Sequence, residues 1–210
     1  MSYWTVPPMW EGRTVAILAS GPSMSPAVAA AVGHLPRIAI NSTYRLAPDA
    51  DVIYAADARW WNANPEAMSC PGILASIEHT PGKRSKETPA AVRVLRYTGR
   101  LGFDPHPGCL RTQTNSGAQA LQIAVHARAA RVLLCGFDMR GGHWHGQHAP
   151  ALGNPDAEAF AKFRAAFRNL ASALAPTGVS IINCTPGSAL DCFPREPLAD
   201  ALRVSAMGAA

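Results

Sequence analysis

The sequence is poor in charged residues, which make up 16% of its 210 positions, against roughly 25% in an average soluble domain. It also lacks any apolar run near the roughly 20 residues that a membrane-spanning helix needs. Glycine (17 residues) and proline (18 residues) are scattered without a period, which excludes collagen-like and low-complexity chains. With 48% hydrophobic residues, the chain is expected to fold as one globular domain over residues 1–210 with a sizeable core.

Clusters of basic residues and closely spaced cysteines are missing as well. The net charge of +5 favours anionic partners, but the chain has no Lys/Arg run typical of dedicated DNA- or RNA-binding proteins. A small molecule that carries phosphate fits this charge equally well. The five cysteines form no CxxC pair, which argues against a zinc knuckle or a redox dithiol. Residues 1–13 show no basic segment followed by an apolar core, so we expect no secretory signal and a cytoplasmic location.

Short apolar runs alternate with helical patterns along the chain. The run Thr14–Ala19 is typical of a strand that is buried on both faces. Ser25 and Pro26 then fit the cap and the first position of a helix, and Arg37–Asn41 follows as a second strand. Such a βαβ unit joins parallel strands. We therefore predict an α/β fold, a single Rossmann-like domain with a mostly parallel sheet and helices on both faces.

The rest of the chain continues this alternation. Further strands are expected at Val52–Ala55, Ile73–Ser76, Val92–Leu95, Val132–Cys135 and Val179–Ile182. Helices are expected at Asp57–Asn62, Ser116–Ala130, Pro155–Ala175 and Pro197–Val204. Outside these elements, residues 1–13 are assigned as a lead-in, Arg96–Gln113 as irregular, and residues 205–210 as a frayed tail. A core-facing stripe is expected on the longest helix from Phe160, Phe163, Phe167, Leu170 and Leu174.

Two predicted helix starts carry residues suited to binding an anion. Glycine lets the backbone approach a ligand closely, and a helix N-terminus offers N–H groups and the positive end of a dipole. The first segment matches neither GxGxxG nor a Walker A loop, so an ordinary strand-to-helix turn is the alternative. The segments are Ser20, Gly21, Pro22 and Ser23 after the first strand, and Asn115, Ser116 and Gly117 at the second helix start.

Two more polar residues directly follow predicted strands. Asn41 comes after the second strand and Asp57 after the third. In open α/β sheets, ligands bind outside the carboxyl ends of the strands. We expect both side chains to face the same crevice as the helix starts, with capping or turn duty as the alternative.

The segment between Asp138 and Pro155 is a long loop, and loops longer than about 12–15 residues are usually functional or disordered. If this loop is locally extended, His143 and His145 face one side and could bind a metal together with His148. No nearby cysteine or carboxylate completes a tetrahedral set, so we expect no metal site. A general base or a phosphate contact suits a loop histidine better, because imidazole titrates near neutral pH. A plain polar loop is the alternative.

Five short segments occur in a characteristic order: Ile17–Ser23, Ile40-Asn41, Thr114–Gly117, Val132–Asp138 and Cys184–Ser188. In this order and spacing they resemble the bacterial sialyltransferases of glycosyltransferase family 42 and the related MptE-like proteins. The resemblance covers about residues 14–190. It implies a Rossmann-like fold in which a nucleotide lies across the carboxyl edge of the sheet. The sialyltransferase branch further implies metal-independent transfer from a CMP-sugar.

The resemblance also implies roles for individual residues. His148 lies at about the position of the family's general-base histidine, which would deprotonate an acceptor hydroxyl. From the loop itself, His145 is a second catalytic candidate. Ser116 and Gly117 would hold the phosphate or sugar of the donor. The other residues assigned to nucleotide binding are Ser20, Gly21, Pro22, Ser23, Asn41, Asp57, Asn115, Asp138, Pro186 and Ser188.

The chain departs from the family pattern at two places. The family commonly has Gly-Asn where this chain has Ala19 and Ser20, so a donor contact made by that asparagine is shortened or lost. The sialyltransferases place tyrosines against the leaving phosphate, whereas this loop has Arg140 at the first matching position and no tyrosine. A cation at this position can still neutralise phosphate. We therefore expect Arg140 to act on a nucleotide conjugate other than a sialic acid donor.

Four functions are compatible with these observations. The leading hypothesis is a nucleotide-dependent transferase, a metal-independent glycosyltransferase with a CMP-sugar-like donor, an unidentified hydroxyl acceptor and no cofactor. The second is diphosphate transfer from ATP, as the MptE-like resemblance suggests, which would need Mg²⁺ to bridge the phosphate oxygens. The third is a non-catalytic module that binds a nucleotide or, less favoured, a nucleic acid. The fourth is a metallohydrolase that uses the three loop histidines.

Overall fold

The computed structural model describes residues 3–80, 82, 85–147 and 152–207. Its strands are β1 (Thr14–Leu18), β2 (Arg37–Ile40), β3 (Val52–Tyr54), β4 (Ile73–Ile77), β5 (Arg93–Gly99), β6 (Cys109–Arg111), β7 (Arg131–Cys135) and β8 (Ser180–Asn183). They form one eight-stranded sheet in the order β6-β5-β4-β3-β2-β1-β7-β8. Every neighbouring pair in this sheet is parallel.

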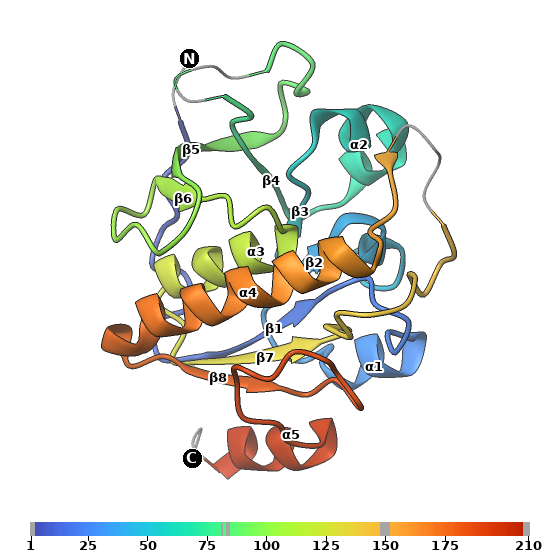
Figure 1. Cartoon of the computed structure of the whole chain (residues 1–210), viewed down its shortest axis with the longest axis vertical. Coiled ribbons are helices and arrows are strands. Elements are labelled where there is room, and N and C mark those ends of the chain that lie inside the picture. The colour runs from blue at the N-terminus through green and yellow to red at the C-terminus, as the bar shows by residue number, and fades with distance from the viewer. Residues whose placement is uncertain (1–2, 81, 83–84, 148–151, 208–210) are drawn as a thin grey trace.

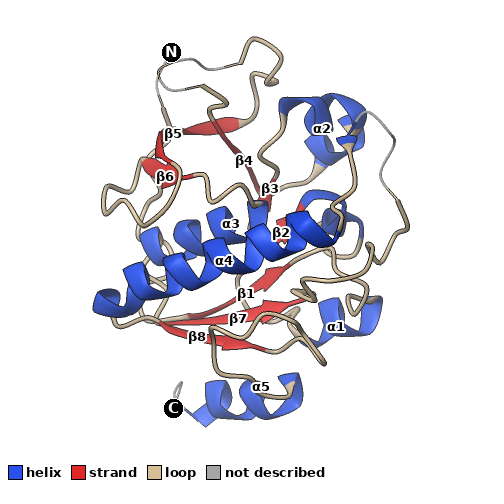
Figure 2. Cartoon of the chain, viewed as in Figure 1, coloured by secondary structure: helices blue, strands red, loops and turns tan. Residues whose placement is uncertain are grey.

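Helices cover both faces of the sheet (Figures 1 and 2). One face packs against α3 (Ser116–His126) and α4 (Ala157–Leu174), which lie side by side. The other face packs against α1 (Pro26–Ala31), α2 (Ala58–Ala63) and α5 (Leu198–Met207). Short 3-10 helices complete the described structure: η1 (Asn41–Arg45), η2 (Pro65–Ser69) and η4 (Ala175–Thr177). The predicted α/β, Rossmann-like fold is confirmed.

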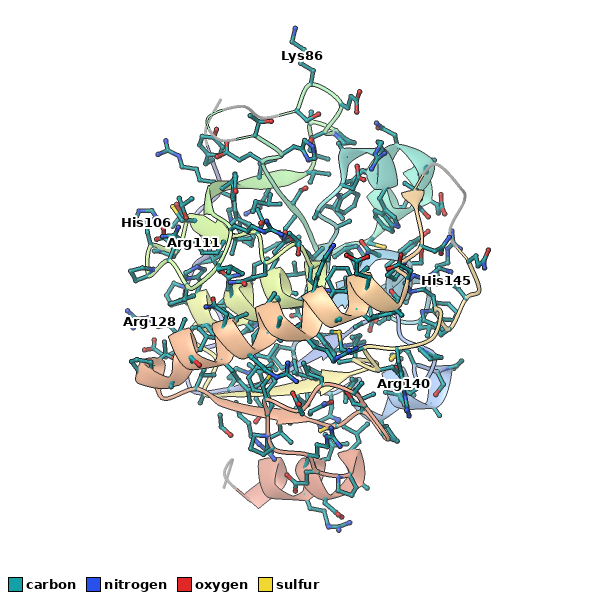
Figure 3. All side chains as sticks on the ribbon, viewed as in Figure 1. Lys86, His106, Arg111, Arg128, Arg140 and His145 are labelled. Atoms are coloured by element: carbon teal, nitrogen blue, oxygen red, sulfur yellow. The ribbon has the colours of Figure 1, made fainter. Side chains whose placement is uncertain are left out.

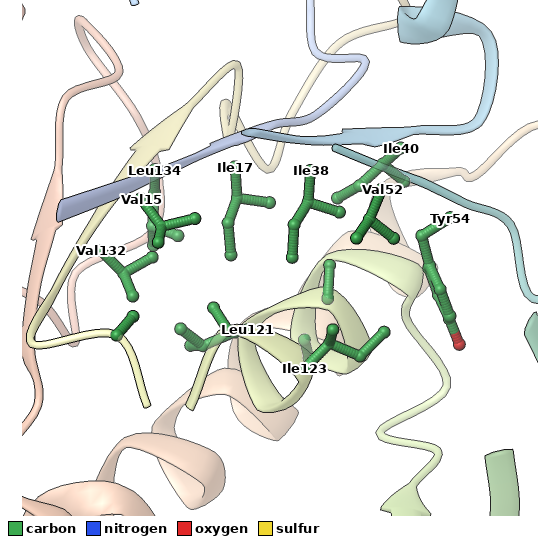
Figure 4. Packing of buried hydrophobic residues seen from close by; sticks show 14 of the residues in the cluster. Val15, Ile17, Ile38, Ile40, Val52, Tyr54, Leu121, Ile123, Val132 and Leu134 are labelled. Carbon is green, nitrogen blue, oxygen red and sulfur yellow. The ribbon is translucent and has the colours of Figure 1, made fainter. Parts of the chain in front are cut away.

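The central strands bury both of their faces. Ile17 and Ile38 point toward Leu121 and Ile123 of α3 (Figure 4), and the residues next to them in sequence point to the opposite face. Because both sets of side chains are shielded from water, these strands are continuous apolar runs rather than alternating patterns. This is why β1, β2 and β7 can be located from the sequence.

The irregular stretch between Arg96 and Gln113 contains a strand that the sequence did not predict. β6 has three residues and pairs with β5 from Arg96↔Cys109 onward, and β5 itself extends to Gly99. Such a short strand lacks a period of its own. It is formed because β5 offers an open edge, so tertiary pairing decides its structure.

The two ends of the chain also differ from the expectation. Residues 1–13 are more than a lead-in, because Trp4, Val6 and Trp10 are buried in the core. The backbone N–H of Trp4 donates to the carbonyl oxygen of Val94 at 2.8 Å, which fixes this segment beside β5. At the other end, α5 continues to Met207, past the predicted end at Val204.

α4 is the longest helix of the described chain. Of its apolar stripe, Phe167, Leu170 and Leu174 are buried, whereas Phe160 and Phe163 are only half-buried. Charged residues such as Arg168 occupy its exposed face. Neither this helix nor any other that the structure describes is both long and apolar enough to cross a membrane.

Phe167 anchors α4 to the sheet, and its removal is expected to destabilise the fold. Its ring makes edge-to-face contacts with Phe137 and Phe193, with centroids 5.9 and 6.3 Å apart, and is fully buried. Phe167→Ala should lower the free energy of unfolding by about 3–5 kcal/mol, since truncation leaves a cavity. Urea denaturation measures this change. Leu101→Ala, at a side chain that is 49% exposed, is the control and should have little effect.

Candidate functional site

A cavity of about 390 Å³ lies at the carboxyl ends of β1, β2 and β7. The strand order reverses here: β2 to β6 lie on one side of β1, and β7 and β8 lie on its other side. This is the point at which open α/β sheets bind ligands, and the volume is within the usual range for small molecules. The walls of this first cavity come from the turn after β1, the start of η1, the start of α3, the segment after β7 and the start of α4.

The turn after β1 packs closely on the end of β7. The N–H of Gly21 donates to the carbonyl oxygen of Gly136 at 2.9 Å. A Cβ at Gly21 would lie 2.4 Å from that oxygen and 2.1 Å from Oδ2 of Asp138, so only glycine fits. The hydroxyl of Ser23 donates to Oδ2 of Asp138 at 2.8 Å, and its N–H points to the same carboxylate. Asp138 therefore ties the two strand ends together.

The start of α3 presents unused backbone donors to the cavity. Asn115 caps the helix by accepting a hydrogen bond from the N–H of Ala118 at 3.1 Å. Ser116 and Gly117 are the first two helical residues and line the cavity, so their N–H groups have no acceptor inside the helix. A Cβ at Gly117 would lie 2.7 Å from the ring of Phe137, which explains the glycine.

The backbone before α3 is in a conformation that side chains rarely adopt. Gln113 and Thr114 are both left-handed, with φ of 50° and 54°. Gln113 is fully buried, and its N–H donates to the carbonyl oxygen of Arg100 at 2.8 Å. These contacts hold the start of α3 at the sheet edge, against the local strain of the β-branched Thr114.

The described part of the loop after β7 lies on the first cavity. Its Trp144 donates through the backbone N–H to the carbonyl oxygen of Ser20 at 3.1 Å and through Nε1 to the hydroxyl of Thr43 at 3.3 Å. On the α4 side, Nη1 of Arg164 donates to the carbonyl oxygen of Met139 at 3.0 Å. Arg140 lines the cavity, and its side chain is exposed. The loop is thus held at both sides with a cation at the rim.

Two of the loop histidines stack on each other. The rings of His143 and His145 are parallel, with centroids 5.2 Å apart, and Nδ1 of His143 donates to the carbonyl oxygen of Ser20 at 3.3 Å. Burial lowers the pKa of both imidazoles, and the charges of His143 and Arg45 lower that of His145 further. His143 lines the cavity, whereas His145 does not. His148 lies outside the described residues.

A metal site is not evident in the described part of the chain. No group of three or more His, Cys, Asp or Glu side chains is arranged to hold a metal ion there. His148 is not included in that search, so the alternative of a metal held by the three histidines is not tested.

The structure brings part of the predicted nucleotide site together. Of the residues predicted to bind the nucleotide or to act in catalysis, the following line the first cavity: Ser20, Gly21, Asn41, Asn115, Ser116, Gly117, Asp138 and Arg140. Pro22, Ser23, Pro186 and Ser188 do not line it. Ser23 and Ser188 have structural partners instead: Ser188 is buried, and its hydroxyl donates to the carbonyl oxygen of Phe137. Pro186 is exposed on the adjoining turn.

Asp57 lies in a different place from the expected one. It caps α2 by accepting from the backbone N–H of Arg59 at 2.8 Å and forms an ion pair with the guanidinium of the same residue. Burial alone raises its pKa, but the hydrogen bonds of Arg59 outweigh burial and lower the pKa overall. It lines a second cavity next to the first rather than the first cavity itself.

The first cavity has an aromatic wall that the sequence did not predict. Phe160 and Phe163, which were expected in the core, line the cavity with their rings 6.1 Å apart in an edge-to-face contact. The length of the helix could have indicated this wall, because α4 has 18 residues and is about 27 Å long. A five-residue strand spans only about 17 Å, so the first turns of α4 extend past the sheet edge.

No protein-family model, no curated protein and no solved structure matches this chain. A fold alone does not define a function, so function is inferred from the cavity and its residues.

Gly21 should be irreplaceable at this site. Gly21→Ala forces the turn away from Gly136 and Asp138, so we expect a lower melting temperature and loss of ligand binding at the first cavity. The matched control is Gly142→Ala, which lies on the same cavity and has nothing within 4 Å of the added Cβ. Differential scanning fluorimetry compares the two variants. Equal melting temperatures would contradict the close packing.

The stacked histidines should make the fold sensitive to acid. Burial lowers the pKa of His143 below its ordinary 6.5, so the unfolded state binds its proton first as the pH falls. The neutral His143 therefore contributes its full stability above about pH 6.5 and loses it progressively below that value. Urea unfolding at pH 7.5 and pH 5.5 should show a smaller loss of stability on acidification in His143→Gln than in the parent chain. An equal loss in both would contradict the assignment.

Proposed function

We propose that this chain is a nucleotide-dependent transferase that moves a sugar or sugar-like group from a nucleotide-sugar donor to a hydroxyl acceptor without a metal. The observation that carries the proposal is the composition of the first cavity. The lining combines donors for phosphate, at Ser116, Gly117 and Arg140, with the aromatic rings of Phe160 and Phe163. A nucleotide conjugate needs both kinds of contact.

The electrostatics of the first cavity favour an anion. Among its described lining residues, Asp138 is the single acidic side chain, and its carboxylate is held by Ser23. Arg140 forms no ion pair within the described residues, so its charge is available to a ligand. Together with the dipole of α3 it can neutralise the phosphate that leaves with the nucleotide.

The aromatic wall fits the uncharged part of the donor. Phe160 and Phe163 expose ring surface into the cavity, and a sugar or base ring covers such surface favourably. Ser20 and Asn41 supply polar groups after the neighbouring strands β1 and β2. The site thus offers contacts for both a phosphate and a ring.

The proposed reaction needs a base as well as an anion site. The acceptor oxygen forms a bond to the anomeric carbon, the bond from that carbon to the phosphate oxygen breaks, and the hydroxyl proton passes to a base. The resemblance assigns this base to His148. His143, kept neutral by burial, is the described imidazole on the cavity wall.

A thermal-shift screen with and without Arg140 tests the proposal. CMP, CDP, UMP, UDP, GDP, ADP and ATP are each tested with Mg²⁺ and with EDTA, since a ligand that binds only the native state raises its stability. We expect a cytidine nucleotide to raise the melting temperature in EDTA, and Arg140→Ala to remove most of that shift. Arg128→Ala is the control, because Arg128 lies on the other side of the molecule in Figure 3 and pairs with Glu11.

The pattern of shifts separates the alternatives. A shift with ATP that requires Mg²⁺ would favour diphosphate transfer over glycosyl transfer. No shift with any nucleotide would contradict a nucleotide-dependent enzyme of either kind.

A further inference from the structure

A second cavity of about 390 Å³ lies further along the same sheet edge, at the carboxyl ends of β3, β4, β5 and β6. Its acidic and basic lining residues are Asp57, Glu78, His79 and Arg100. It shares Thr114, Asn115 and Ser116 with the first cavity, so the two hollows meet at the start of α3. The proposed function assigns a ligand to the first cavity only.

We infer that the second cavity binds the acceptor, and that this acceptor is a small hydroxylated molecule carrying an anionic group, a phosphate or a carboxylate. This inference rests on the proposed transferase function, because only a transferase has an acceptor. Arg100, the residue on which the binding of an anion depends, does not line the first cavity.

The carboxylates of the second cavity are already engaged. Asp57 is paired with Arg59 at 2.6 Å. Glu78 is buried, and one carboxylate oxygen accepts from the N–H groups of Tyr97 at 2.8 Å and Gly82 at 3.3 Å. The other oxygen accepts from the hydroxyl of Tyr3. Neither carboxylate is left to bind a cationic ligand.

Among the described lining residues of the second cavity, Arg100 is the single arginine or lysine. Its side chain is exposed and forms no ion pair or hydrogen bond within the described part of the chain. Its backbone is fixed, because its carbonyl oxygen accepts from the N–H of Gln113, which directly precedes the shared wall. A guanidinium on a fixed backbone at the rim of a polar cavity is suited to a phosphate or a carboxylate.

The rest of the second cavity suits hydroxyl groups. Thr112, Thr114 and Ser116 supply hydroxyls, and the side chain of Gln119 lines the same space. The amide of Gln119 is engaged at both ends, since its oxygen accepts from the hydroxyl of Tyr54 at 2.7 Å and its NH2 group donates to the carbonyl oxygen of Thr112, so Gln119 gives this wall rigidity while the hydroxyls face a ligand. Rigid polar groups favour a ligand with several hydroxyls over an apolar one.

The shared wall places the two ligands for reaction. A donor phosphate at the N–H groups of Ser116 and Gly117 and an acceptor hydroxyl near Thr114 would lie on the two sides of one short segment. Holding both reactants at one rigid segment supplies the proximity that group transfer needs. The strained conformation of Gln113 and Thr114 is what gives this segment its place between the cavities.

The test compares binding at the two cavities by isothermal titration calorimetry. The probes are glucose 6-phosphate and glucuronate, glucose as the uncharged control, and CMP for the first cavity. The proteins are the parent chain, Arg100→Ala, Arg140→Ala and the control Arg128→Ala. Arg100 is exposed and unpaired in the described structure, so its variant should keep the parent melting temperature.

We expect at least one sugar anion to bind the parent chain and glucose not to bind. Arg100→Ala should weaken the sugar anion at least tenfold and leave CMP unchanged, whereas Arg140→Ala should do the reverse. Failure of both sugar anions to bind, an unchanged affinity in Arg100→Ala, or displacement of the anion by CMP would overturn the inference. Binding of the sugar anion through Arg100 with no nucleotide binding at all would keep the second site and overturn the transferase function instead.

Discussion

The contact between the turn after β1 and the end of β7 is the constraint on which the rest of the site depends. Gly21 lies so close to Gly136 and Asp138 that no side chain fits between them, and Ser23 closes the contact through its hydroxyl. This contact brings the two strand ends together at the point where the sheet reverses its order. The floor of the first cavity is the result. Asp138, which the sequence assigns to nucleotide binding, lines the cavity and also accepts hydrogen bonds from the N–H and the hydroxyl of Ser23.

The crossover from β6 to β7 decides how the sheet edge is divided. β6 is at one edge of the sheet and β7 is past its centre, so α3 must run across the intervening strands, and it contacts β1, β2 and β6. Its first residues therefore stand at the carboxyl edge between two hollows. Gln113 and Thr114 adopt left-handed backbone conformations to make this turn. The segment that carries strain is also the one that both cavities share, as is common where strain is retained for function.

Charge is distributed unevenly along this edge. The acidic side chains at both cavities bind the protein itself: Asp138 binds Ser23, Asp57 binds Arg59, and Glu78 binds backbone N–H groups. One arginine at each cavity, Arg140 and Arg100, has no such partner within the described structure. An edge with engaged carboxylates and available guanidinium groups selects anions, and this holds for both proposed ligands. The net charge of +5 is consistent with that selection but does not locate it.

The sequence by itself determined the fold class, the strands β1, β2 and β7, the cap of α1 and the presence of α4, because these depend on local patterns: continuous apolar runs, Ser25 before Pro26, and a stripe at helical spacing. It also placed Ser20, Gly21, Asn41 and Ser116 at one sheet edge, since parallel strands bring their carboxyl ends together. Only the tertiary structure decided that β6 forms, that Phe160 and Phe163 line the first cavity, and that Asp57 belongs to a second cavity. Each of these depends on which distant segment lies alongside, and no local pattern encodes a partner that is far away in the chain.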